Sequence, residues 1–221
     1  MTSYRDELDR ALAFTGVDHE LAARARADEL VSVAERHLGD PAALDALDAG
    51  CGIGLTDRQL HGRFASLSGT DVSAVALETA ARANPGVRYE LAERGRLPFR
   101  DGRFDFVFAS HVLQVVPVSE RPRFVSELAR VTRGGGLVAV VEHNPYNPGT
   151  WLVVRRFRSD EPIVMLPPGR TKRLLRENGL TPVDAAFFLL MPSRRSKVLR
   201  IERSLRRLPV AAQYYVAAWA A

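Results

Sequence analysis

The alternation of short apolar runs with helical segments is the feature that most constrains the fold of this chain. Between the apolar runs, the residues carry the 3.6-residue spacing of amphipathic helices. Strands that are almost continuously apolar and are separated by helices indicate a parallel sheet covered on both faces. We therefore predict a doubly wound, Rossmann-like α/β domain with seven strands. The strand candidates are residues 44–50, 65–72, 87–92, 103–110, 137–143, 182–192 and 210–220.

The N-terminal segment is predicted to be helical. Residues 19–38, "HELAARARADELVSVAERHL", carry apolar side chains near one face and charges on the other. The stretch "GDPAAL" ends this pattern before the first strand candidate. We therefore predict a helical cap over residues 1–40, followed by one compact domain over residues 41–221. The residues expected on the apolar face are Leu21, Ala25, Leu30, Ala34 and Leu38.

Length and composition fit one cytoplasmic domain. A chain of 221 residues is long enough for one sizeable core. No apolar stretch reaches the length that a membrane span needs, and the charged N-terminal residues lack the apolar core of a signal peptide. The single cysteine, Cys51, excludes an internal disulfide and a cysteine metal cluster. We expect a cytoplasmic protein with no metal and no membrane partner.

Positive charge is concentrated in the C-terminal part of the chain. Residues 153–207 hold 14 Lys and Arg against five acidic residues. Such a patch indicates either an anionic partner such as RNA or basic helices whose charges face solvent. We favour the solvent-facing alternative, because the arginines of residues 195–208 lie on an amphipathic helix without the interleaved aromatic residues of single-strand binders. The predicted apolar stripe of this helix is Val198, Ile201, Leu205 and Leu208.

A glycine-rich loop follows the first strand candidate. Residues 48–54, "DAGCGIG", place three glycines at alternate positions, which indicates a tight turn or a close approach to a ligand. In open α/β folds this loop is where nucleotides bind. The dehydrogenase fingerprint would need a glycine at Leu55, and a phosphate-binding P-loop would need Lys-Ser/Thr after its last glycine. Because both are missing, the loop favours a nucleoside whose tail carries an amine rather than a pyrophosphate.

An acidic residue stands at the end of the second strand candidate. Asp71 in "GTDVS" follows Gly50 by 21 residues, and an acid at this spacing can accept hydrogen bonds from both hydroxyls of a ribose. A lone Asp at a strand end is more commonly a helix cap or a turn residue. Because Asp71 occurs together with the glycine loop, we favour the interpretation that it binds a ribose.

Four segments in this order resemble the class I S-adenosylmethionine-dependent methyltransferases. They are "LDAGCGIG", "GTDVS", "RLPFRDGRFDFVFASHVLQVV" and "ELARVTRGGGLVAVVEHNP". Later segments, "EHNPYNPGT", "LPPGRTKRLLRENGL" and "LPVAAQYYVAAW", are similar to a bacterial branch that acts on small molecules. The resemblance implies a mostly parallel sheet with an antiparallel last strand. It also implies that residues 41–221 form the methyltransferase domain, with S-adenosylmethionine as methyl donor.

The resemblance also implies roles for individual residues at the donor site. Asp48 would face the methionine end of the ligand, Asp71 would hold the ribose, and Val72 would lie beside the adenine. Glu93 stands where the family usually has an Asp that contacts the adenine amine. Ser110 follows the fourth strand, near the expected position of the methyl group, and Cys51 is expected to be an inert residue of the loop. The implied cofactor-binding set is Asp48, Gly50, Cys51, Gly52, Gly54, Asp71, Val72, Glu93 and Ser110.

Methyl transfer from a sulfonium is an in-line displacement, so catalysis depends mainly on alignment of the two reactants. A general base is needed only when the acceptor keeps its proton at neutral pH. We predict His111, His143 and Tyr146 as catalytic candidates, with Glu142 as a further candidate base. His111 is the best placed, although it could instead close the pocket without transferring a proton. On the N-terminal helix, Arg24 or Arg26 is a candidate partner for the carboxylate of the ligand.

Three functions remain open at this level. The first is an enzyme that methylates a small molecule, such as a secondary metabolite. The second is a catalytically silent S-adenosylmethionine-binding protein or partner subunit of the same fold. The third is an RNA methyltransferase, which the basic C-terminal region would suit. The intact glycine loop and Asp71 favour retained ligand binding, and we expect a small-molecule partner rather than nucleic acid.

Overall fold

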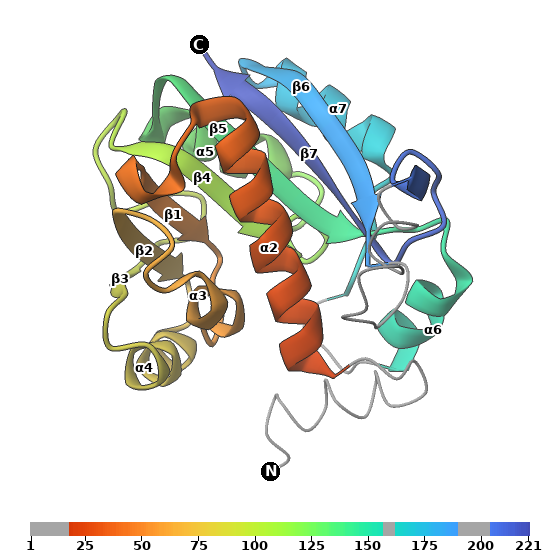
Figure 1. The fold of residues 1–221 in the computed structure, drawn as a ribbon, viewed down its shortest axis with the longest axis horizontal. Coiled ribbons are helices and arrows are strands. Elements are labelled where there is room, and N and C mark those ends of the chain that lie inside the picture. Colours follow the sequence, from red (N-terminus) through yellow and green to blue (C-terminus); the bar gives the residue numbers. More distant parts are fainter. Residues whose placement is uncertain (1–17, 157–161, 190–203) are drawn as a thin grey trace.

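Seven strands form one sheet in the order β3-β2-β1-β4-β5-β7-β6 in the computed structural model of the chain (Figure 1). The structure describes residues 18–156, 162–189 and 204–221. Each pair of neighbours from β3 to β5 is parallel, whereas β7 runs antiparallel to both β5 and β6. The predicted fold class is therefore confirmed. The strands are β1 Asp45–Ala49, β2 Ser66–Asp71, β3 Arg88–Leu91, β4 Phe104–Ser110, β5 Thr132–His143, β6 Leu180–Phe188 and β7 Gln213–Ala220.

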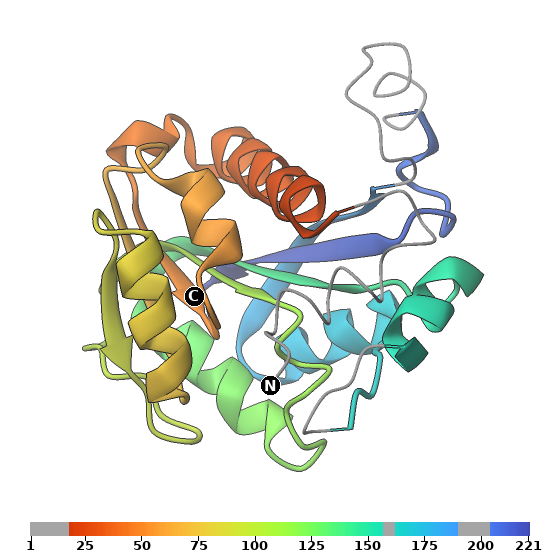
Figure 2. The same cartoon turned by 90° about the horizontal axis from the view of Figure 1, so that it is seen from below.

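Helices cover both faces of the sheet. Figure 2 shows α2 and α3 over one face and α5 and α7 over the other. Two apolar clusters fill the spaces between these layers, one on each face of the sheet. The helices are α2 His19–Leu38, α3 Leu55–Leu60, α4 Ala74–Ala83, α5 Arg121–Val131, α6 Pro148–Arg156 and α7 Pro168–Glu177, with a 3₁₀ turn at Pro41–Ala43.

Helix α6 lies in a segment for which the sequence analysis predicted no helix. The side chain of Asn147 accepts a hydrogen bond from the backbone N–H of Thr150 at 3.0 Å. Asn147 therefore caps the helix, and Pro148 occupies its first position, where a missing N–H costs nothing. An asparagine followed by proline at a helix start was the signal that could have predicted α6.

Helix α2 lies within the predicted helical segment and ends where predicted, but its buried face is rotated from the predicted one. The fully buried positions include Ala23, Ala27, Leu30 and Ala34, at spacings of four, three and four residues. Leu21, predicted on the apolar face, is only partly buried. Because alanine side chains are short, this face allows α2 to lie close to the sheet. The described part of the predicted cap thus packs directly on the sheet, and residues 1–17 lie outside the described residues.

A network of polar side chains connects α2 to the antiparallel strands β6 and β7. The hydroxyl of Tyr215 donates to Asp184 at 2.7 Å and accepts from Arg36 at 2.9 Å and from Arg206 at 3.0 Å. Arg206 also pairs with Glu29 of α2 at 2.6 Å, and Arg36 pairs with Asp184 at 3.0 Å. The prediction that Arg206 points into solvent is therefore wrong. Its charge connects the C-terminal segment to α2.

The predicted helix over residues 195–208 lies mostly outside the described residues, which resume at Ser204. Within the described part, Leu208 is half exposed, so the predicted packing of this residue is wrong. Val198 and Ile201 of the predicted stripe lie outside the described residues. Asn144 and Asn147 hold the chain that follows, because their amide groups donate to the carbonyls of residues 209–211 at 2.6 to 2.9 Å.

Tyr215→Phe tests the polar network. The substitution keeps the ring but removes the hydroxyl that Arg36, Arg206 and Asp184 share. We expect the free energy of unfolding to fall by about 1–3 kcal/mol, the range for hydrogen bonds that involve charged groups. Denaturant unfolding measures the change. Tyr146→Phe is the matched control, since Tyr146 is 59% exposed; an equal loss in both variants would contradict the network's role.

Candidate functional site

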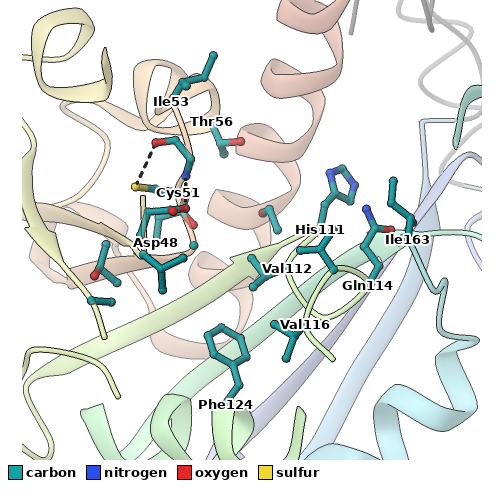
Figure 3. A pocket seen from close by; sticks show the side chains of 18 of the residues that line it. Asp48, Cys51, Ile53, Thr56, His111, Val112, Gln114, Val116, Phe124 and Ile163 are labelled. Carbon is teal, nitrogen blue, oxygen red and sulfur yellow. Dashed lines mark hydrogen bonds between the residues drawn. The ribbon is translucent and has the colours of Figure 1, made fainter. Parts of the chain in front are cut away.

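A cavity of about 710 Å³ lies at the carboxyl ends of β1, β2, β4 and β5. The sheet order reverses between β1 and β4, and open α/β folds bind ligands at such a switch point. Figure 3 shows side chains of the glycine loop on one side of the cavity and His111, Gln114 and Ile163 on the other. All of the predicted donor-site residues except Gly54 line the cavity, as do His111 and His143. Tyr146 is exposed and is not among the lining residues.

The three glycines of the loop all have positive φ, of +88°, +55° and +73°. A Cβ on Gly50 would lie 2.5 Å from a methyl carbon of Val112, and one on Gly54 would lie 2.4 Å from the amide nitrogen of Asn84. Gly52, by contrast, faces open space and lines the cavity. Gly50 and Gly54 thus allow neighbouring side chains to pack against the loop, and Gly52 leaves the backbone of the loop accessible to a ligand.

Asp71 is held in place by backbone groups while keeping capacity for a ligand. Its Oδ2 accepts from the N–H of Gly52 at 2.9 Å, and its Oδ1 accepts from the N–H of Ser73 at 2.9 Å. Each carboxylate oxygen can accept a second hydrogen bond. The neighbouring Val72 is 54% exposed although it is apolar, and Glu93 lies exposed at the rim of the cavity.

Two buried carboxyl groups lie behind the glycine loop. Asp48 and Asp57 are almost fully buried, and the Oδ1 atom of each has no hydrogen-bond partner among the described residues. Burial raises the pKa of both carboxyl groups, and the negative charge of Asp57 raises that of Asp48 further.

Asp57 extends this pair into a network that supports the loop. Its Oδ2 accepts from the hydroxyl of Tyr89 at 2.8 Å. The amide of Asn84 donates to that hydroxyl at 2.9 Å and to the carbonyl of Gly54 at 3.0 Å. Asp57 was not predicted as a site residue. Its signal in the sequence is an acidic side chain in the first turn of the helix that follows the glycine loop.

Of the two arginines predicted to reach the ligand, Arg26 lines the cavity and Arg24 does not. Arg26 is 8% exposed, and its Nε donates to the hydroxyl of Thr56 at 3.3 Å. This contact places a guanidinium from α2 beside the start of α3. The thiol of Cys51 lines the same end of the cavity, and burial together with the nearby acidic groups raises its pKa strongly. The thiol therefore stays protonated and unreactive.

His111 and His143 form a stacked pair. Their ring centroids are 4.0 Å apart, and the rings are parallel within 2°. The Nδ1 of His143 lies 2.9 Å from the Oε1 of Gln114. Because an amide oxygen only accepts hydrogen bonds, Nδ1 carries the hydrogen and Nε2 carries the lone pair. Burial lowers the pKa of both rings, that of His143 to about 4, and the charge of Arg26 adds to the effect.

His111 also has an unusual backbone. Its φ of +61° lies in the left-handed region, which is uncommon for residues other than glycine. Its N–H donates to the carbonyl of Val141 at 2.8 Å, which fixes this conformation at the end of β4. Strain of this kind is characteristic of functional sites. The neighbouring Ser110 has a buried hydroxyl oxygen with no partner among the described residues.

Glu142 lies beneath the loop that follows β4 and does not line the cavity. Its side chain is fully buried, and its Oε1 accepts from the N–H of Leu113 at 2.9 Å. Burial raises its pKa to about 8, partly offset by hydrogen bonds from the backbone and by the charge of Arg121. The candidate base of the sequence analysis is therefore placed where it can support the loop rather than contact a substrate.

Residues 47–140 match the family model of a methyltransferase domain. Malonyl-[acyl-carrier protein] O-methyltransferase of Serratia marcescens is 30% identical over 146 residues, which cover 62% of this chain and 55% of that protein. The chain thus spans about half the length of the curated relatives it matches.

Solved methyltransferase structures share the fold. A geranyl diphosphate methyltransferase in complex with S-adenosylmethionine superposes with a TM-score of 0.64 at 20% identity, over 90% of this chain and 85% of that one. An S-adenosylmethionine-dependent methyltransferase from Mesorhizobium loti superposes with a TM-score of 0.61 at 21% identity, over 85% of this chain and 96% of that one. The fold is therefore the one that S-adenosylmethionine-dependent methyltransferases use.

No cluster of three or more His, Cys, Asp or Glu residues suited to a metal ion occurs within residues 18–156, 162–189 and 204–221. Within the same ranges, every helix is too short or too polar to cross a membrane.

The raised pKa of Glu142 predicts a pH-dependent stability. Because the folded-state value of about 8 lies above the usual 4.5, its contribution is full at low pH and is lost as the pH rises through 8. Relative to Glu142→Gln, the wild type should lose about 2–4 kcal/mol between about pH 5 and 9, since one pKa unit corresponds to about 1.4 kcal/mol. Denaturant unfolding of both proteins across this range measures the difference. A pH-independent difference would contradict a buried, neutral Glu142.

Proposed function

We propose that this protein binds S-adenosylmethionine in the cavity and transfers its methyl group to a small molecule. The arrangement of Asp71 and Gly52 is the observation that carries the proposal. The two residues face the same cavity and are joined by a hydrogen bond of 2.9 Å, so a ribose acceptor and an accessible loop backbone lie together. The match of residues 47–140 to a methyltransferase domain supports the same activity.

The lining residues suit each part of the donor. Val72 offers an exposed apolar surface for the adenine, and Glu93 offers a carboxylate for its amine. Asp48 lines the cavity with an oxygen that lacks a partner among the described residues, as an ammonium group requires. Arg26 supplies a cation for the carboxylate. When bound, the donor supplies a sulfonium whose methyl group is the electrophile.

Ser110 and His111 follow β4 and are assigned to the methyl-transfer end of the site. The protein's main contribution is alignment, because in-line displacement needs the acceptor atom directly behind the methyl carbon. His111 and His143 are neutral at physiological pH, so neither ring repels the positive sulfonium. Tyr146 receives no role in this proposal, since its side chain is exposed outside the cavity.

We also propose that the chain belongs to a bacterial branch marked by the stretch "EHNPYNP" at residues 142–148. The contacts of this stretch support the proposal, because the side chains of Glu142, His143, Asn144 and Asn147 each have a structural partner. Asn144 and Asn147 hold residues 209–211, and Glu142 holds the loop after β4. The stretch thus connects the wall of the cavity to the C-terminal strand.

Asp71→Ala tests the donor site. The wild type should bind S-adenosylhomocysteine with micromolar affinity, and the variant should bind about 10- to 100-fold more weakly, because it loses about 1.5–3 kcal/mol of hydrogen bonding to a charged group. Isothermal titration calorimetry measures both. Glu35→Ala is the matched control, as Glu35 is an exposed acid of α2. The proposal fails if the wild type does not bind, or if Asp71→Ala and Glu35→Ala bind equally.

A further inference from the structure

The described residues of one wall of the cavity carry no charge. The described residues that β5, α6, residues 162–167 and β7 contribute to the lining are His143, Val153, Val154, Ile163 and Gln213. The charged lining residues come instead from β1, β2, α2, α5 with the residue before it, and the loop after β3. Three of the five wall residues are aliphatic. This wall therefore favours an apolar molecule over an ion, because burying an unpaired charge is costly.

Two polar groups interrupt this apolar wall. Gln213 is 4% exposed, and its Oε1 has no hydrogen-bond partner among the described residues. It stands directly opposite His143 in the antiparallel register of β5 and β7. The contact of His143 with Gln114 leaves its Nε2 as a hydrogen-bond acceptor. No hydrogen bond to either acceptor occurs among the described residues, and for the buried Oε1 of Gln213 this costs free energy.

We propose that this wall binds an uncharged acceptor molecule with an apolar body and a hydroxyl group, and that Gln213 determines this specificity. The inference rests on the proposed function and names its substrate class. The aliphatic side chains contact the body of the acceptor, while its hydroxyl donates its one hydrogen either to Oε1 of Gln213 or to Nε2 of His143. A carboxylate would bring no hydrogen to either acceptor, and an ammonium group would have no counter-charge among the described residues of this wall.

The reaction that follows is an O-methylation. The hydroxyl oxygen attacks the methyl carbon, the carbon–sulfur bond breaks, and its electron pair stays on the sulfur. The oxygen loses its proton to Nε2 of His143, from which the proton passes to water. Burial makes this imidazole a weak base, but an oxygen that has gained a methyl group is a far stronger acid than imidazolium. A weak base therefore suffices.

The test compares two probes of similar shape, 4-propylphenol and 4-propylbenzoate, on protein saturated with S-adenosylhomocysteine. Ligand-observed NMR measures both affinities. We expect the phenol to bind about tenfold more tightly or better, because a site that hydrogen-bonds a hydroxyl rejects analogues that cannot donate. Gln213→Leu should abolish this preference while changing the affinity for S-adenosylhomocysteine less than about twofold. Thr181→Val, an exposed substitution on β6, is the control and should retain the preference.

The outcomes separate this inference from the function on which it rests. In one outcome, S-adenosylhomocysteine binds, but the phenol does not bind or binds no better than the benzoate. The proposed acceptor class is then wrong, whereas the proposed donor site is supported. A preference that survives Gln213→Leu overturns the role of Gln213. If S-adenosylhomocysteine itself does not bind, the proposed function fails and this inference fails with it.

Discussion

The reversal of strand order between β1 and β4 is the constraint on which the rest of the structure depends. Since β2 and β3 extend the sheet to one side and β4 and β5 to the other, the loops after β1 and β4 diverge and leave a cavity. The glycine loop follows β1, Asp71 ends β2, and His111 follows β4. Each group assigned to methyl transfer therefore reaches the same cavity from a different strand.

Burial controls the charges of this cavity. Behind the glycine loop, burial raises the pKa of Asp48 and Asp57. Burial also keeps His111 and His143 neutral, and the nearby charge of Arg26 adds to this effect. The acidic groups and Arg26 suit the amino-acid part of S-adenosylmethionine, whereas the two neutral rings suit an uncharged acceptor. The neutral rings therefore favour the proposed O-methylation of a hydroxyl.

Local sequence patterns predicted the features that depend on neighbouring residues. Spacing within short segments predicted the strands along the chain, the C-terminal end of α2, the glycine loop and the position of Asp71 at a strand end. Features that depend on contacts between distant segments were missed. Gln213 of β7 pairs with His143 of β5, which lies 70 residues earlier in the chain. Arg206 forms an ion pair with Glu29 of α2. Neither pairing has a local signal.

A crystal structure with S-adenosylhomocysteine bound tests the central claim most directly. We expect the ribose hydroxyls on Asp71, the adenine against Val72, the amino-acid part near Asp48 and Arg26, and the sulfur facing His111. The space between the sulfur and Gln213 should remain open for the acceptor. A ligand whose ribose does not contact Asp71, or one whose sulfur faces away from the wall that includes Gln213, would contradict the account.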